Sequence, residues 1–199
     1  HGYANAGAAM TEKSSYAAYV AGKATRVPMV YIGANDGMLH GFRADSGAAD
    51  SGRELMAHVP SASFDKLNRL MQIGYTHTYF VDGSPVVGDA YLNSNWKTVL
   101  VGSLGAGGKG VFALDVSDPT NHGPTKVLWE YADSADLGYT FGQAQIARLA
   151  SGHWVAIFGN GYNSTNDRAY LYVVNLADGS LLRKIPAGTA TSNGLSAPS

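Results

Sequence analysis

The sequence predicts an all-β fold, a partial β-propeller of about three four-stranded antiparallel blades with one short inserted helix. Glycine accounts for 25 of the 199 residues, against a usual share of about 7%, and so many glycines indicate frequent tight turns. Twelve tyrosines and three tryptophans supply flat side chains that fill sheet faces well. The third observation is a strand-rich segment that recurs along the chain.

This segment occurs three times, at 30–59, 99–131 and 156–185. Each copy begins with an apolar run that ends in glycine and continues through a turn rich in Gly and Asn. A second β-like run, a turn that contains Asp, and a third short run complete the copy. The turn residues are those that β-hairpins require, and repeated meanders of this kind are typical of propeller blades.

A further apolar run precedes the second and third copies, "SPVVGDAYL" and "GQAQIARL". Each run is followed by a tight turn and a tryptophan, Trp96 or Trp154, which gives these copies four strands; the first copy lacks a clear leading strand. The expected organisation is a lead-in at 1–26 and a propeller at 27–199, with blades at about 27–59, 82–131 and 140–186 and the start of another blade at 194–199. Because propellers protect their edges by closing a ring, we expect this chain to be part of a larger ring or to associate with other fragments.

The inserted helix is expected between the first and second blades. Four apolar residues recur there at helical spacing: Phe64, Leu67, Leu70 and Met71. Ser61 or Ser63 is the candidate N-cap, and Gly74 is expected to end the helix. The helix would cover a blade edge or link the two blades.

Four stretches together resemble one known family: "VYIGANDGMLHGF", "YFVDGSPVVGDAY", "WKTVLVGSLGAGGKGVFALDV" and "FGQAQIARL…WVAIFGNGYNS". The chain from about residue 27 to residue 199 is similar to the C-terminal propeller domain of the PilC/PilY-type type IV pilus biogenesis proteins. The resemblance implies a modified β-propeller on a large exported protein, at the outer membrane, cell surface or pilus tip. It also implies a non-enzymatic role in pilus extension, surface attachment and twitching motility, with pilus tip or minor pilin components and a host or abiotic surface as partners.

The same resemblance raises the question of calcium. The family's propeller carries a loop of the Asp-x-Asp-x-Asp-Gly type, which follows a segment like Ser196–Pro198. No such run occurs in these 199 residues, so no cofactor or metal ligand is expected within this chain, and calcium remains an expectation for the intact parent protein. An Arg-Gly-Asp adhesion motif is absent as well, because Ala44 stands in the glycine position of "RAD".

Composition excludes several classes of function. The net charge is −1 and the sequence has no basic stripe, so nucleic-acid binding is not expected. No run of about 18 apolar residues is present, so membrane insertion by this segment is not expected. The chain has no cysteine, which removes disulfides and thiol chemistry.

Three polar or glycine-rich stretches resemble sites but fit turns better. Asn35-Asp36-Gly37 is interpreted as a type I′ or related hairpin turn. Asp45, Asp50 and Glu54 lack the ligand spacing of a calcium loop and predict a solvated turn between two strands. The stretch "GSLGAGGKG" at 102–110 does not meet the phosphate-loop pattern and predicts a flexible hairpin.

No catalytic residue emerges from the remaining motifs. The six histidines have no paired metal-binding spacing; His77 is expected to make a local hydrogen bond. No GxSxG elbow is present. Trp96, Trp129 and Trp154 are expected to pack between blades, and contacts with partners are expected from the loops Asn160–Asp167 and Gly105–Lys109.

Two alternative functions stay open at this point. The stretch "GVFALDVSD…KVLWEY" resembles the blade repeat of PQQ-type quinoprotein dehydrogenases, but fold does not fix function. A carbohydrate-binding propeller is the other alternative, in which Tyr139 or Tyr162 would stack on sugar rings.

Overall fold

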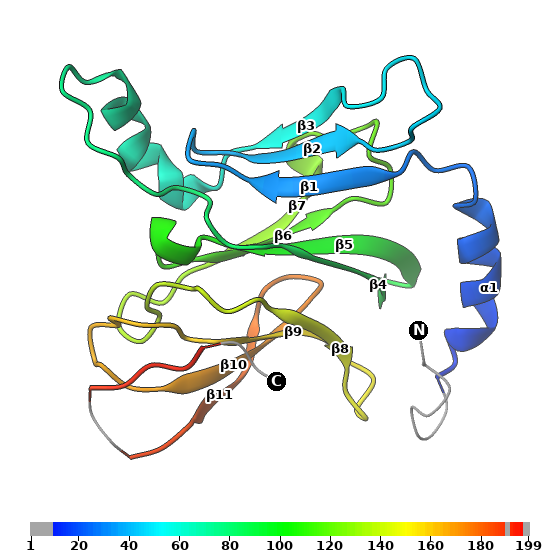
Figure 1. Cartoon of the computed structure of the whole chain (residues 1–199). Coiled ribbons are helices and arrows are strands. Elements are labelled where there is room, and N and C mark those ends of the chain that lie inside the picture. Colours follow the sequence, from blue (N-terminus) through cyan, green and yellow to red (C-terminus); the bar gives the residue numbers. More distant parts are fainter. Residues whose placement is uncertain (1–9, 190–191, 197–199) are drawn as a thin grey trace.

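The computed structural model describes residues 10–189 and 192–196 of the chain. It confirms the all-β prediction, because three antiparallel sheets of three, four and four strands lie one above another in chain order (Figure 1). We call these sheets blades 1, 2 and 3. They occupy residues 29–58, 86–131 and 145–186, inside the ranges expected for the blades.

Blade 1 has the strand order β1-β2-β3, and blades 2 and 3 have the orders β4-β5-β6-β7 and β8-β9-β10-β11. The blade 1 strands are β1 (Met29–Gly33), β2 (Leu39–Arg43) and β3 (Glu54–His58). The blade 2 strands are β4 (Val86–Leu92), β5 (Asn95–Ser103), β6 (Val111–Asp115) and β7 (Val127–Tyr131). The blade 3 strands are β8 (Gln145–Arg148), β9 (Trp154–Gly159), β10 (Tyr170–Asn175) and β11 (Leu181–Pro186). The sequence shows no clear leading strand in the first copy. Among the described residues, blade 1 accordingly has three strands where blades 2 and 3 have four.

The hairpin turns follow from their residue types. Asn93 and Ser94 both adopt positive φ, 50° and 65°, which is the requirement of a two-residue type I′ turn between β4 and β5. The turn at 35–37 does join β1 to β2, and the Ala34 amide donates to the Met38 carbonyl at 2.9 Å. The hairpin is therefore confirmed, and of the turn types expected the type I′ form is excluded, because only Gly37 of the three residues has a positive φ.

Two hydrophobic cores hold the blades together. The core between blades 1 and 2 consists of buried residues from both sheets and the segment between them: Leu39, Met56, Val81, Leu100, Leu104, Phe112, Leu114 and Val116. The core between blades 2 and 3 is larger and includes Val99, Val101, Trp129, Trp154, Ala156, Phe158 and Tyr172. Successive residues of β5 therefore face opposite neighbours, as the period of two in a strand demands.

All three tryptophans pack between elements, as predicted. The rings of Trp96 and Trp154 meet edge to face, with centroids 5.7 Å apart. Trp129 of blade 2 donates its indole N–H to the Leu176 carbonyl of blade 3 at 2.9 Å. Each tryptophan is at most 9% exposed, so these rings contribute to the contact between blades 2 and 3.

The glycines that end the first run of each copy are not structurally equivalent. A Cβ on Gly33 would overlap Val81, and one on Gly159 would overlap the backbone at Leu195, so both glycines admit the segment that passes beside the strand end. Gly102 lies on the opposite face, where a Cβ would overlap the Phe112 ring. The sequence repeat is therefore shifted by one residue in blade 2.

The inserted helix is a 3-10 helix, η2 (Ser61–Met71), and it differs from the expectation at both ends. Pro60 occupies the N-cap position and no side chain caps the helix, so neither predicted serine cap is correct. The helix ends at Met71, three residues before Gly74. Two short 3-10 turns, η3 (Gly105–Gly107) and η4 (Pro124–Lys126), complete the helical elements of blade 2.

An α-helix, α1 (Lys13–Gly22), lies within the predicted lead-in and was not expected. It covers one end of blades 2 and 3 (Figure 1). Tyr16 packs on Trp96 with ring centroids 4.5 Å apart, and the Arg148 Nε donates to Glu12 Oε1 at 2.6 Å just before the helix. Residues 1–9 of the lead-in and residues 197–199 of the expected next blade lie outside the described residues.

Candidate functional site

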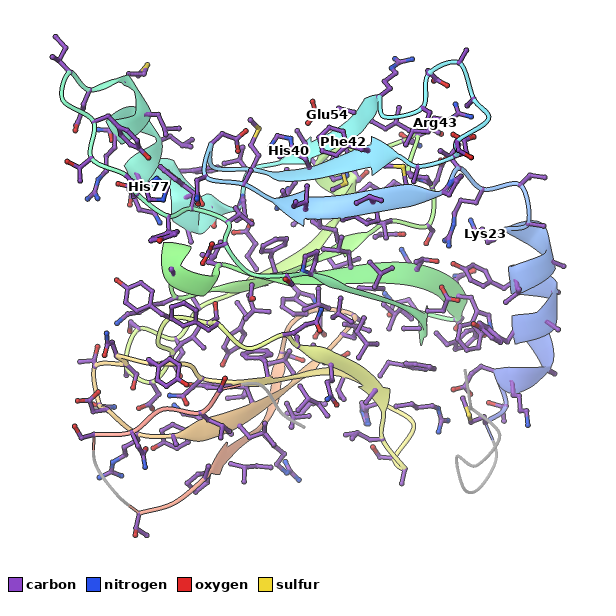
Figure 2. The ribbon with its side chains drawn as sticks, viewed as in Figure 1. Lys23, His40, Phe42, Arg43, Glu54 and His77 are labelled. Atoms are coloured by element: carbon purple, nitrogen blue, oxygen red, sulfur yellow. The ribbon has the colours of Figure 1, made fainter. Side chains whose placement is uncertain are left out.

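Loops from two blades and a projecting arm meet at one end of the molecule, which we call the loop end. It comprises the η3 loop (104–110), the segment 137–141 and the loop 160–167. The arm, residues 61–79, contains η2 and projects from the body on the same side, where Figure 2 shows His77; Lys23 and α1 lie at the opposite end. Such loops on a rigid scaffold are the usual place for binding residues.

The two loops expected to present contacts lie side by side. The Lys109 amine donates to the Asn163 carbonyl at 2.5 Å and lies 5.7 Å from the centre of the Tyr139 ring. Tyr139 and Tyr162 form a β-bridge. Backbone contacts therefore join the loops of blades 2 and 3 into one surface.

Exposed aromatic rings lie on this joined surface. Phe141 and Tyr162 are 50% and 45% exposed, and their ring centroids are 5.9 Å apart. Asn160 does not belong to the exposed surface, because it is fully buried. Its amide donates to the carbonyls of Asp136 and Arg168, so this residue braces the loop and does not present a contact.

The arm carries the most exposed apolar side chains of the described chain. Ile73 is completely exposed, Met71 is 83% exposed and Phe64 is 58% exposed. The arm is held at its middle, where the Lys66 amine donates to the Gly107 carbonyl and lies 5.2 Å from the centre of the Phe80 ring. An exposed apolar cluster of this kind is typical of an interaction surface.

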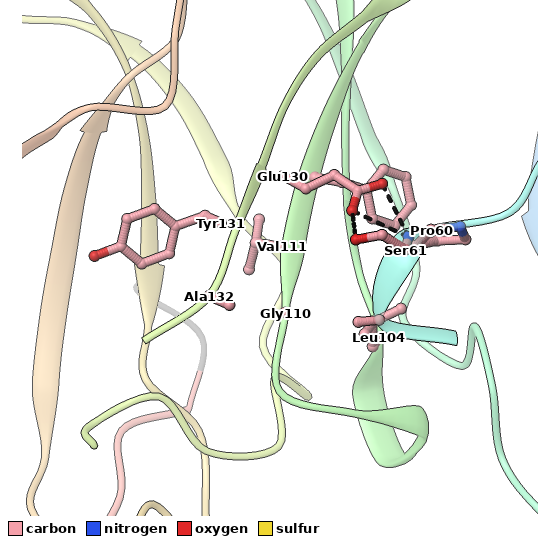
Figure 3. Close-up of a pocket in the computed structure, with 10 residues that line it drawn as sticks. Pro60, Ser61, Leu104, Gly110, Val111, Glu130, Tyr131 and Ala132 are labelled. Carbon is pink, nitrogen blue, oxygen red and sulfur yellow. Dashed lines mark hydrogen bonds between the residues drawn. The ribbon is translucent and has the colours of Figure 1, made fainter. Parts of the chain in front are cut away.

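An apolar pocket of about 110 Å³ lies where the arm begins (Figure 3). Its walls come from the start of the arm and from blade 2: Pro60, Ser61, Ala62, Leu104, Gly110, Val111, Phe112, Glu130, Tyr131 and Ala132. Glu130 of β7 is the charged residue of the lining. Both of its carboxylate oxygens accept the Ser61 amide, at 3.1 and 3.0 Å, and the Ser61 hydroxyl donates to the same carboxylate.

Two histidines of blade 1 have contrasting environments. Burial lowers the pKa of His58, and the nearby carboxylate of Glu130 only partly opposes this shift. His40 is held between carboxylates of Glu54, at 2.5 Å, and Asp36, at 2.9 Å. The hydrogen bond to Glu54 is the main reason why the pKa of His40 is raised.

A network of charged and polar side chains connects the segment between blades 2 and 3 to β10 and β11. Asp133 accepts from the Tyr172 hydroxyl at 2.8 Å and from the Lys184 amine at 3.0 Å, and Asp136 also contacts Lys184. Burial would raise the pKa of Asp133, but the bonds from Lys184 and Tyr172 outweigh burial and lower that pKa to about 2. These contacts hold the segment between blades 2 and 3 against β11.

The acidic residues Asp45, Asp50 and Glu54, which were compared with a calcium loop, form ion pairs within blade 1. Arg43 contacts Asp45 at 2.6 Å and Asp50 at 2.8 Å, while Glu54 is bonded to His40. Among residues 10–189 and 192–196, no group of three or more His, Cys, Asp or Glu could hold a metal ion. No helix in this part of the chain is long and apolar enough to cross a membrane.

Two further expectations need revision. The stretch 102–110 does connect β5 to β6 as a hairpin, but it forms η3 and buries Gly105 and Gly107, where a flexible loop was expected. A Cβ on Gly107 would overlap the Phe80 carbonyl, so glycine is needed for close packing. The structure gives His77 a ring contact with Tyr79, with centroids 4.8 Å apart, where a local hydrogen bond was expected.

The sequence did not reveal the contact between Ser61 and Glu130. The two residues are separated by 69 positions, and Ser61 was interpreted as a helix cap. In the sequence, the one indication of this contact is Glu130 itself, a single charged residue between Trp129 and Tyr131 in the apolar run "KVLWEY".

Comparisons with known proteins give one consistent family. A family model described as the PilY1 beta-propeller domain matches residues 3–199. The type IV pilus biogenesis factor PilY1 of Pseudomonas aeruginosa PAO1 is 48% identical over 191 residues, which cover 92% of this chain and 16% of that protein. A PilY1 homolog of Xylella fastidiosa Temecula1 is 45% identical over 192 residues, or 94% of this chain and 13% of the homolog. The crystal structure of the P. aeruginosa PilY1 C-terminal domain matches with a TM-score of 0.75 and 46% identity, over 92% of this chain and 35% of that chain.

Proposed function

The chain belongs to the PilY1 β-propeller family, and on that basis we propose that it is a non-catalytic propeller segment of a type IV pilus biogenesis and adhesion protein. The chain spans about one sixth of the P. aeruginosa relative. The roles in pilus extension, surface attachment and twitching motility are therefore proposals for the whole parent protein. The same holds for its location at the outer membrane, cell surface or pilus tip.

One observation carries the proposal beyond family membership: the loop end is braced from within and presents aromatic rings outward. Asn160 and the bridge between Tyr139 and Tyr162 fix the loop backbone, and the rings of Phe141 and Tyr162 remain about half exposed. Pre-ordered rings lose little conformational freedom on binding. We assign this surface to contact with pilus tip or minor pilin components.

The proposal assigns no cofactor or metal to this chain. The resemblance to calcium-binding relatives concerns the intact parent protein, and calcium control is proposed there only. Alcohol-dependent dye reduction on addition of PQQ and calcium would contradict the non-catalytic assignment and favour the quinoprotein alternative.

The test compares variants of the intact parent protein in the bacterium that produces it. Replacing Phe141 and Tyr162 by serine removes the exposed rings and leaves Asn160 in place. We expect the parent protein to stay folded and exported, and its capture of purified pilus tip components to fall by at least about tenfold, since interface aromatic residues often contribute 2 kcal/mol or more. Equal capture by the variant and the unaltered protein would refute the assignment.

A matched control uses similarly exposed apolar residues away from the loop end. Val20 on α1 and Val87 on β4 are 48% and 44% exposed, and replacing both by serine should leave capture unchanged. Surface pili, twitching and attachment are scored in the same strains. Deleting residues 27–186 should abolish these activities, while the control strain should keep them.

Carbohydrate binding is the second candidate function, and the ring pair at the loop end favours it. Aromatic faces are common stacking platforms, and Phe141 and Tyr162 offer two within 5.9 Å. A glycan array probed with the parent protein separates the candidates. Binding to a defined glycan that is lost in the serine variant, with capture of pilus components intact, would favour the carbohydrate function.

A further inference from the structure

The arm begins at a contact that joins three elements. Ser61, the first residue of η2, donates its amide and hydroxyl to the carboxylate of Glu130 on β7. Just before η2, the last residue of β3 is His58, which faces the same carboxylate. One acidic group of blade 2 thus lies between the start of the arm and the end of blade 1.

His58 is buried and its Nε2 is not hydrogen-bonded within the described residues. The residue is 8% exposed, and Nε2 has no hydrogen-bond partner there. The distance from Nε2 to Glu130 Oε1 is 3.7 Å, which is too long for a hydrogen bond. The ring packs instead on Phe112 with centroids 5.3 Å apart, so it is positioned but not bonded at this nitrogen.

Two titratable groups face His58 from the elements packed against it. Glu130 is on β7, and His122, in the loop that leads to η4, presents its ring edge-on at 6.1 Å between centroids. Lys126 of η4 acts on His122. A cavity of about 230 Å³ lined by both histidines adjoins them, so water can deliver a proton to this site.

We propose that His58, Glu130 and Ser61 form a proton-operated latch that sets how firmly the apolar arm is held to blade 2. With neutral His58, the carboxylate of Glu130 accepts from Ser61 and the arm is held. When His58 gains one proton from solvent, both ring nitrogens carry N–H and Nε2 becomes a cationic donor. The carboxylate moves to Nε2, because a charge-assisted hydrogen bond is stronger than a neutral one, and Ser61 loses its acceptor.

The direction of the switch follows from the same geometry. Burial lowers the pKa of His58, and the charge of Glu130 opposes that shift without cancelling it. The unlatched form therefore accumulates as the pH falls below the ordinary histidine value of about 6.5. Its consequence is a looser first turn of η2, which lets Phe64 reorient while Lys66 still holds the arm to the Gly107 carbonyl. This inference is independent of the partner assigned to the loop end.

The test is hydrogen exchange on the whole chain, followed by mass spectrometry at pH 7.5 and pH 5.0 and corrected for the intrinsic pH dependence of exchange. Loss of one hydrogen bond to a charged group is worth about 1.5 kcal/mol or more. We therefore expect peptides covering residues 60–71 to lose protection by about tenfold at pH 5.0. Peptides covering β9 and β10 should keep their protection.

Three variants separate the latch from other acid effects. His58→Gln removes the proton acceptor, and Glu130→Gln keeps an acceptor for Ser61 but removes the negative charge; both should abolish the acid response of residues 60–71. His40→Gln is the matched control, since His40 is already bonded at both nitrogens, and it should respond like the unaltered chain. An unchanged acid response in either of the first two variants, or no response in the unaltered chain, overturns the proposal.

A second measurement guards against variants that fail to fold. In the unaltered chain, the side-chain nitrogen signals of His58 and the amide signal of Ser61 are followed by NMR from pH 8 to pH 4.5. The latch requires both groups to titrate with one midpoint. Separate midpoints, or a Ser61 signal that follows His122 instead, would overturn the assignment.

Discussion

Truncating Trp129 should weaken the contact between blades 2 and 3 more than almost any other single change. The ring is 6% exposed, and a buried Trp→Ala change costs about 3–5 kcal/mol. The indole N–H also satisfies the Leu176 carbonyl, whose unpaired state adds about 1 kcal/mol. The sum lies near 5 kcal/mol, a large part of the 5–15 kcal/mol that usually stabilises a domain.

Thermal unfolding monitored by far-UV circular dichroism measures the effect. For a chain of this size, about 1 kcal/mol shifts Tm by about 2–4 °C, so Trp129→Ala should lower Tm by about 10–20 °C. Trp129→Phe keeps most of the ring and loses the hydrogen bond, and a loss of about 1–2 kcal/mol corresponds to a fall of a few degrees. A fall below about 5 °C for the alanine variant would refute the role of this ring.

Gly179 tests the same contact from blade 3. It has φ +73°, and an added Cβ would lie 2.8 Å from Trp129 Cγ. Gly179→Ala therefore combines a left-handed backbone penalty of about 1 kcal/mol with overpacking of about 1–3 kcal/mol. In the Trp129→Ala background the overlap with the ring is removed and only the Cβ of residue 129 stays close, at 2.9 Å, so Gly179→Ala should cost less than it does in the unaltered chain. Equal costs in both backgrounds would show that the two residues do not press on each other.

Three other perturbations have defined outcomes. Gly107→Ala should destabilise the chain by about 1–3 kcal/mol, because the new methyl group overlaps the Phe80 carbonyl; an unchanged Tm would contradict this packing. Arg148→Met should cost about 3–5 kcal/mol in chemical denaturation, because it removes the cationic partner of the buried carboxylate of Glu12. Adding Glu12→Leu should restore most of the loss, and no restoration would count against the ion pair. The folded-state pKa of Asp133, about 2, lies below its unfolded value of about 3.9, so its contribution is full above that value and is lost as the pH falls toward 2. Asp133→Asn should flatten the acid limb of a stability–pH curve, and an equally steep limb in the variant would contradict the assignment.

Much of the fold is predictable because turn residues carry their own geometry. Asn93 and Ser94 mark a hairpin in the sequence and adopt the positive φ angles that the hairpin requires. The tryptophans are predictable for a similar reason, since large rings are buried wherever a sheet face is covered. By contrast, α1 gives no clear signal. No residue of this helix is fully buried, and it is held by tyrosines such as Tyr16, whose ring packs on Trp96 while its hydroxyl bonds Asp89.

The candidate site is less predictable because it depends on contacts between distant segments. Asn160 lies in a loop of polar residues and was expected to be exposed, yet its amide bonds backbone carbonyls on both sides. Ser61 carries the signature of a helix cap, but its partner is Glu130 on another blade. In both cases the residue type predicts hydrogen bonding, and only the fold determines the partner.

At the loop end, glycines allow the close contacts between distant segments. A Cβ on Gly138 would overlap the backbone of Tyr162, and a Cβ on Gly161 would overlap the backbone of Tyr139. The residues that the sequence presents as flexible turns are therefore the points where backbone packs directly on backbone. Such packing fixes the loops that carry the exposed rings, so the surface is ordered before any partner arrives. A single methyl group at Gly138 or Gly161 should consequently reduce partner capture by disturbing Tyr162, although the side chain of Tyr162 itself is unaltered.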